Sequence, residues 1–127
     1  MSDSLSAVIE GEQAAVYAYG VAGPHISTDG RDLLLGGLAA HRARVIALRE
    51  RSDVDPPAPA GFEVPAITTD AEARQLLADV EARLAASYAD LAADTPGGDR
   101  TDAVLAAREC SVRSVSWGGA PQAFPGR

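Results

Sequence analysis

The stretch Ser52–Thr69, SDVDPPAPAGFEVPAITT, decides how this chain folds, because it separates two pairs of helical patterns. Its four prolines fix the backbone φ angle and remove amide donors, so no helix can pass through the segment. About 18 extended residues at roughly 3.1 Å each exceed the roughly 30 Å length of a 20-residue helix. The segment can therefore carry the chain from one end of a helical bundle to the other.

Apolar residues at three- and four-residue intervals predict amphipathic helices on both sides of this segment. The expected helical ranges are residues 3–23, 31–51, 70–94 and 101–116. The inward face of the last range is assigned to its large aliphatic residues, Val104, Leu105, Val112 and Val115. Thr69–Glu72 has the sequence of a capping box at the start of the third helix.

The lengths of the links predict the topology of the bundle. Short links between the first two helices and between the last two make antiparallel neighbours, and a crossover over residues 52–69 makes the second and third helices parallel. The prediction is one all-α domain over residues 1–127, a four-helix bundle of two antiparallel hairpins joined by a long proline-rich crossover. This is the connectivity of ferritin-like bundles.

Composition excludes several classes of function. The 18 acidic residues outnumber 11 basic residues, all of them arginine, and the net charge of −7 repels nucleic acid and anionic membrane surfaces. The single Cys110 cannot form an internal disulfide, and no apolar stretch approaches the roughly 20 residues of a membrane span. The start of the chain lacks the pattern of a secretion signal. These features predict a soluble cytoplasmic protein with neither nucleic acid nor membrane as partner.

A polar residue interrupts the apolar pattern near the middle of each expected helix. These residues are Glu12, His41, Glu81 and Glu109. Burying carboxylates and an imidazole is costly unless they pair with one another or bind a metal ion. The sequence therefore places a candidate site at one internal level of the bundle.

Several segments together resemble the ferritin-like superfamily, and within it a group of small actinobacterial domains of unknown function. The segments are Glu12–Gly20 (EQAAVYAYG), His41–Arg44 (HRAR), Pro56–Ala60 (PPAPA), Ser87–Leu91 (SYADL) and Ala123–Gly126 (AFPG). The resemblance covers nearly the whole chain and implies a four-helix bundle. It implies no particular activity.

The candidate site can be compared, position by position, with the ligand pattern of di-iron members of the superfamily. That pattern uses one Glu from each of two helices and a Glu-x-x-His pair from each of the other two. Here Leu38 stands where the Glu before His41 belongs, and Val112 stands where the His after Glu109 belongs. With two of the expected ligands replaced by aliphatic residues, the sequence predicts a degenerate di-iron site.

Two interpretations of the four polar residues remain open, and a third places Glu81 or Glu109 in solvent. In the first, Glu12, His41, Glu81 and Glu109 hold a single Fe, Mn or Zn ion. In the second, which is the favoured one, Glu12 pairs with His41, and Arg108 points inward to neutralise Glu81 or Glu109. Tyr19 and Tyr88 lie two turns beyond Glu12 and Glu81 on the same faces, where their hydroxyls can reach buried carboxylates.

These observations favour a non-catalytic binding or assembly protein without a cofactor, and leave a mononuclear metal-binding protein or metalloenzyme as the alternative. A short, alanine-rich bundle covers its apolar faces thinly, which predicts a homodimer. A run of arginines on the second helix predicts either a solvated face with ion pairs or a partner surface. The run comprises Arg42, Arg44, Arg49 and Arg51.

Overall fold

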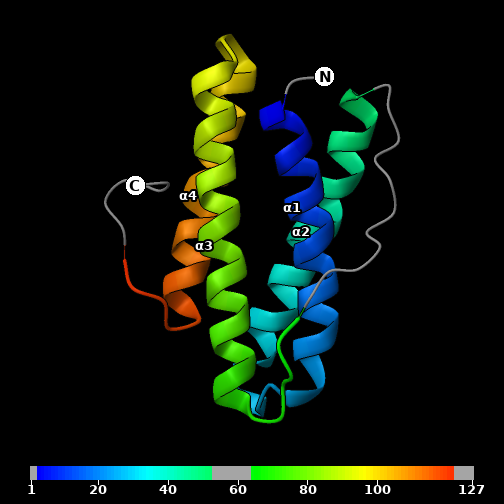
Figure 1. Cartoon of the computed structure of the whole chain (residues 1–127), viewed down its shortest axis with the longest axis vertical. Coiled ribbons are helices and arrows are strands. Elements are labelled where there is room, and N and C mark those ends of the chain that lie inside the picture. Colours follow the sequence, from blue (N-terminus) through cyan, green and yellow to red (C-terminus); the bar gives the residue numbers. More distant parts are fainter. Residues whose placement is uncertain (1–2, 53–63, 122–127) are drawn as a thin grey trace.

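The computed structural model describes residues 3–52 and 64–121, and these form a bundle of four helices (Figure 1). The helices are α1 (Asp3–Ala22), α2 (Arg31–Arg51), α3 (Asp70–Asp94) and α4 (Gly97–Ser116). Two short 3-10 turns, η1 (Gly23–His25) and η2 (Thr28–Gly30), join α1 to α2. The described part of the chain contains no strand, and the prediction of an all-α helical bundle is confirmed.

The helix bounds lie close to the predicted ranges, and α4 differs most. It begins at Gly97 rather than at Thr101, because Gly97 adopts a positive φ of 63° that turns the chain directly into the helix. The capping box at the start of α3 is present, with Thr69 Oγ1 accepting a hydrogen bond from the Glu72 amide at 3.1 Å. The Glu72 side chain in turn accepts from the Thr69 amide.

Figure 1 shows the direction in which each helix runs. α1 and α2 run antiparallel, as do α3 and α4, while α3 begins at the opposite end of the bundle from the one where α2 ends. The predicted crossover falls on residues 52–69, of which residues 53–63 lie outside the described residues. None of the helices described is both long enough and apolar enough to cross a membrane.

The core lies mainly around α3, which packs against both α1 and α4, while α2 packs mainly against α1. Apolar side chains form two clusters. One cluster contains Leu48 and Leu84, and the other contains Leu34 and Leu77. His41 on α2 and Glu81 on α3 fall between these pairs along their helices, so the candidate polar residues separate the two halves of the core.

The orientation of α4 corrects the sequence prediction. Its buried residues are small: Ala103, Ala106, Ala107, Cys110 and Ser114. The large aliphatic residues expected inside are instead between 44% and 59% exposed: Val104, Leu105, Val112 and Val115. Small side chains let α3 and α4 approach closely, and the extensive contact between these helices favours this face over the bulkier one.

Candidate functional site

His41 is the centre of a buried polar network that joins three helices. It is 1% exposed, and the two carboxylates beside it, Glu12 from α1 and Glu81 from α3, are fully buried. His41 Nδ1 lies 2.5 Å from Glu12 Oε1, and His41 Nε2 lies 2.8 Å from Glu81 Oε2. Each edge of the imidazole therefore faces one carboxylate.

Two tyrosines extend this network on either side. The Tyr88 hydroxyl donates to Glu12 Oε2, and the Tyr19 hydroxyl donates to Glu81 Oε2. Trp117 Nε1 donates to the Tyr19 oxygen at 2.9 Å, so the chain of hydrogen bonds runs from the end of α4 to the middle of α3. Tyr19 and Tyr88 thus occupy the role predicted for them, as donors to buried carboxylates.

The network contains two acidic side chains, Glu12 and Glu81, and two basic side chains, His41 and Arg113. Arg113 Nη1 reaches Glu81 Oε1 at 3.4 Å, so the two carboxylates face one guanidinium and the imidazole of His41. Burial by itself would lower the pKa of His41, but hydrogen bonds to Glu12 and Glu81 raise it to about 9. At neutral pH both ring nitrogens are therefore protonated and donate.

The same buried environment shifts the pKa values of acidic groups around His41. Burial tends to raise the pKa of Glu81, and the hydrogen bond and charge of His41 outweigh it, so the pKa of Glu81 is lowered. Burial and the adjacent carboxylates raise the pKa of both Tyr19 and Tyr88, which keeps these phenols as neutral donors. Burial also raises the pKa of the Cys110 thiol, which is the opposite of what a nucleophilic cysteine requires.

This arrangement of donors does not fit a metal ion. A histidine ligand must offer a nitrogen lone pair, yet both nitrogens of His41 are directed at carboxylates. Glu12 and Glu81 lie on opposite edges of the imidazole, so they do not converge on a common point beside one of its nitrogens. Within residues 3–52 and 64–121, no group of three or more His, Cys, Asp or Glu side chains is placed to hold a metal ion.

Two residues of the predicted site lie outside the network. Glu109 is exposed and forms an ion pair with Arg44, with Arg44 Nη2 2.6 Å from Glu109 Oε2. Arg108, predicted to point inward, is also exposed. Both predictions are wrong for one reason, since α4 turns its small residues inward and thereby turns positions 108 and 109 toward solvent.

Arg113 and Trp117 are the two network residues that the sequence analysis missed. Arg113 lies three residues after Cys110 on α4, and Trp117 follows the last residue of the helix, seven residues after Cys110. The stripe of alanines on the buried face of α4 was the available signal. Had it been taken as the inward face, Arg113 rather than Arg108 would have been assigned to Glu81.

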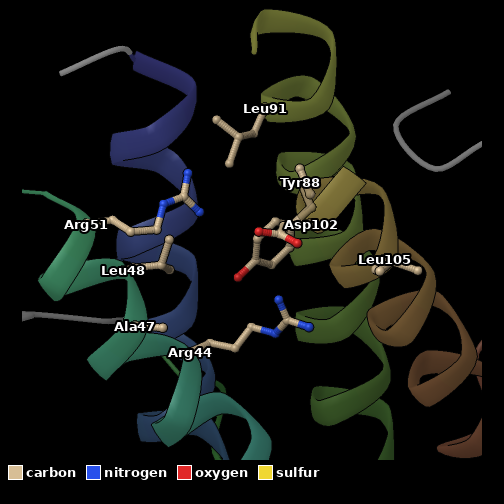
Figure 2. A pocket seen from close by; sticks show the side chains of 9 residues that line it. Arg44, Ala47, Leu48, Arg51, Tyr88, Leu91, Asp102 and Leu105 are labelled. Atoms are coloured by element: carbon tan, nitrogen blue, oxygen red, sulfur yellow. The ribbon is translucent and has the colours of Figure 1, made fainter. Parts of the chain in front are cut away.

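A small pocket opens beside the network between α2, α3 and α4 (Figure 2). Its volume is about 190 Å³, and Leu48 and Leu91 contribute to its apolar lining. The Arg44 guanidinium lies 5.6 Å from the centre of the Tyr88 ring while paired with Glu109, and Arg51 pairs with Asp99 at 3.3 Å. Both arginines at this pocket already have acidic partners, so the pocket carries no free positive charge for an anionic ligand.

The fold and the site together define a class of protein: an all-helical bundle with a charge-balanced polar network at its centre. The chain belongs to the family described as "Domain of unknown function (DUF4439)", which matches residues 4–127. It is similar to the crystal structure of a conserved hypothetical protein from Mycobacterium tuberculosis, with 26% sequence identity and a TM-score of 0.81. That similarity covers 90% of this chain and 91% of the mycobacterial chain. A search of curated proteins finds no match.

Proposed function

We propose that this chain is a ferritin-like bundle in which an internal hydrogen-bond network replaces the metal centre, and that it acts by binding or assembly rather than by catalysis. One observation carries the proposal: both nitrogens of His41 are engaged by carboxylates, at 2.5 Å and 2.8 Å. A histidine held in this way is a structural cation. Among the described residues, no free base or nucleophile remains at the centre of the bundle.

The ferritin-like part of the proposal is supported by the helix directions and by the level of the polar residues. α1 and α2 form one hairpin and α3 and α4 form another, and their directions are those of a bundle with one long crossover (Figure 1). Glu12, His41 and Glu81 come from three helices, as ligands do in the di-iron pattern. α4 contributes none, because Glu109 and Val112 both face solvent.

Elemental analysis tests the absence of a metal cofactor. The protein is purified without chelators, and separate samples are then dialysed against Fe(II), Mn(II) or Zn(II). We expect far less than one metal ion per chain, with the same result for His41→Ala. One transition-metal ion per chain in the wild type, lost in His41→Ala, would instead support a mononuclear site that uses Glu12, His41 and Glu81.

Assembly is proposed to be homodimerisation through the outer face of α4. This face carries Val104, Leu105, Val112 and Val115, each at least 44% exposed. A helix that keeps its small residues inside and its large aliphatic residues outside is the reverse of the usual pattern for a soluble monomer. A second copy of the chain would bury the same stripe on both protomers in an isologous contact.

A further inference from the structure

Gln13 is a buried polar residue that the network around His41 does not use. It lies on α1 next to Glu12 and is 7% exposed. Its Nε2 atom is buried and has no hydrogen-bond partner, and it is the sole side-chain atom in this state in the part of the chain that the structure describes. A buried amide without a partner costs free energy, so such a group calls for an explanation.

The Gln13 side chain lines a groove between α1 and α2. The groove has a volume of about 340 Å³, which falls within the roughly 300–1,000 Å³ range of small-molecule sites. Its walls are Val16 from α1 and Val45 and Ile46 from α2, and Ile46 is 59% exposed. The groove is therefore mainly apolar, with one amide in its lining.

Two arginines on the α2 side of this groove have no ion-pair partner among the residues that the structure describes. Arg42 and Arg49 are seven residues apart, which places them two helical turns, or about 10 Å, from each other on one face. Both are exposed, and neither forms an ion pair with any residue in the described ranges, including Glu10 one turn before Gln13. Arg44 and Arg51 on the same helix are both paired.

We propose that the α1–α2 groove, lined by Gln13, Val16, Arg42, Val45, Ile46 and Arg49, binds a small amphiphilic carboxylate. The apolar body of such a ligand packs on the three aliphatic side chains. Its carboxylate pairs with an arginine on the rim and accepts a hydrogen bond from the Gln13 amide after rotation of that side chain. The site is separate from the His41 network, so its failure would leave the proposed function untouched.

An NMR titration with sodium octanoate, kept below its micelle concentration, tests this proposal. We expect shift changes concentrated at the Gln13 side-chain amide and at the methyl groups of Val16, Val45 and Ile46. Acetate lacks the apolar body and 1-octanol lacks the charge, so both should bind more weakly than octanoate. Shift changes spread over the whole bundle, or equal affinity for octanoate and octanol, would contradict the proposal.

Variants identify the groups that recognise the carboxylate. Arg42→Gln and Arg49→Gln replace exposed residues, and at least one should weaken octanoate binding about threefold to fivefold, as expected for an exposed ion pair. Gln13→Leu should remove most of the preference for octanoate over octanol. Arg31→Gln, at an exposed arginine at the start of α2, is the matched control and should leave the affinity unchanged. Octanoate affinity equal to wild type in the Arg42→Gln/Arg49→Gln double variant would overturn the proposal, provided thermal unfolding shows that the fold is intact.

Discussion

At the scale of single residues, His41 holds together the charges at the middle of the bundle. It separates two fully buried carboxylates and contacts both. Tyr88 donates to the other oxygen of Glu12, whereas Tyr19 donates to the same Glu81 oxygen that faces His41. Buried ion pairs add little net stability compared with an apolar core, but removing one partner leaves an uncompensated charge in a region of low dielectric. Loss of one member of the network therefore lowers the stability of the fold by more than the intact network adds to it.

Replacing His41 by alanine should strongly destabilise the fold. The change leaves Glu12 and Glu81 buried and facing each other across a cavity without the cation between them, and breaking a buried pair in this way costs about 3–5 kcal/mol. Urea unfolding measures the difference. Arg108→Ala, at an exposed position, is the control and should change stability by less than about 0.5 kcal/mol. Similar small losses for both variants would show that the network contributes little.

The raised pKa of His41 predicts loss of stability in mildly alkaline solution. Its folded-state pKa of about 9 exceeds its ordinary value of 6.5, so the folded state binds the proton more tightly than the unfolded state. The stabilisation is complete below pH 6.5 and is lost as pH rises through 9. Thermal unfolding between pH 6 and 10 should show a falling midpoint across this window.

His41→Gln is the control for this pH dependence, because it keeps a polar side chain that does not titrate. Its unfolding midpoint should change much less between pH 6.5 and 9 than that of the wild type. An NMR titration of the His41 ring in the folded protein gives the pKa directly. A folded-state pKa at or below 6.5 would contradict the prediction.

At the scale of the element, α4 shows what determines which of two apolar faces of a helix is buried. One face carries alanines, Cys110 and Ser114, and the other carries valines and Leu105. Burying the larger side chains would remove more apolar area from water. The small face is nevertheless the buried one, because it allows close packing on α3, and the Ser114 hydroxyl donates to the Ala78 carbonyl at 2.8 Å.

Two substitutions test this orientation of α4. Ala106→Leu adds volume at a fully buried position against α3 and should destabilise the fold by about 1–3 kcal/mol. Val112→Ala removes volume at a position that is 59% exposed and should cost less than about 1 kcal/mol. Chemical denaturation compares the two. A large loss for Val112→Ala together with a neutral Ala106→Leu would show that the helix is turned the other way.

At the scale of the whole molecule, the outward face of α4 is the surface on which the proposed dimer depends. Light scattering at tens of micromolar should give the mass of two chains. Introducing charge with Val104→Asp/Val112→Asp should shift the protein toward the monomer without unfolding it, because both positions are more than half exposed. Ile46→Asp, on α2, is the control and should remain dimeric. A monomeric mass for the wild type would remove the assembly proposal.

The sequence by itself determined closely where the helices lie, and it placed Glu12, His41 and Glu81 among the four residues expected at their centre. Helix ends are set by prolines, glycines and the capping box at Thr69, all of which act within one turn of the chain. Glu12, His41 and Glu81 each interrupt an apolar stripe, so periodicity favours the inward direction that the structure shows for all three, although it left exposure of Glu81 open.

Only the tertiary structure decided which face of α4 is buried, and with it the partners of two carboxylates. Periodicity cannot rank two apolar faces of one helix, since both satisfy the same spacing and the choice depends on the fit against α3. That fit brings Arg113 to Glu81 and leaves Glu109 to pair with Arg44 at the surface. Arg113 and Glu81 are 32 positions apart in the chain, and Arg44 and Glu109 are 65 positions apart. Such contacts depend on how whole helices pack, and no local sequence pattern encodes them.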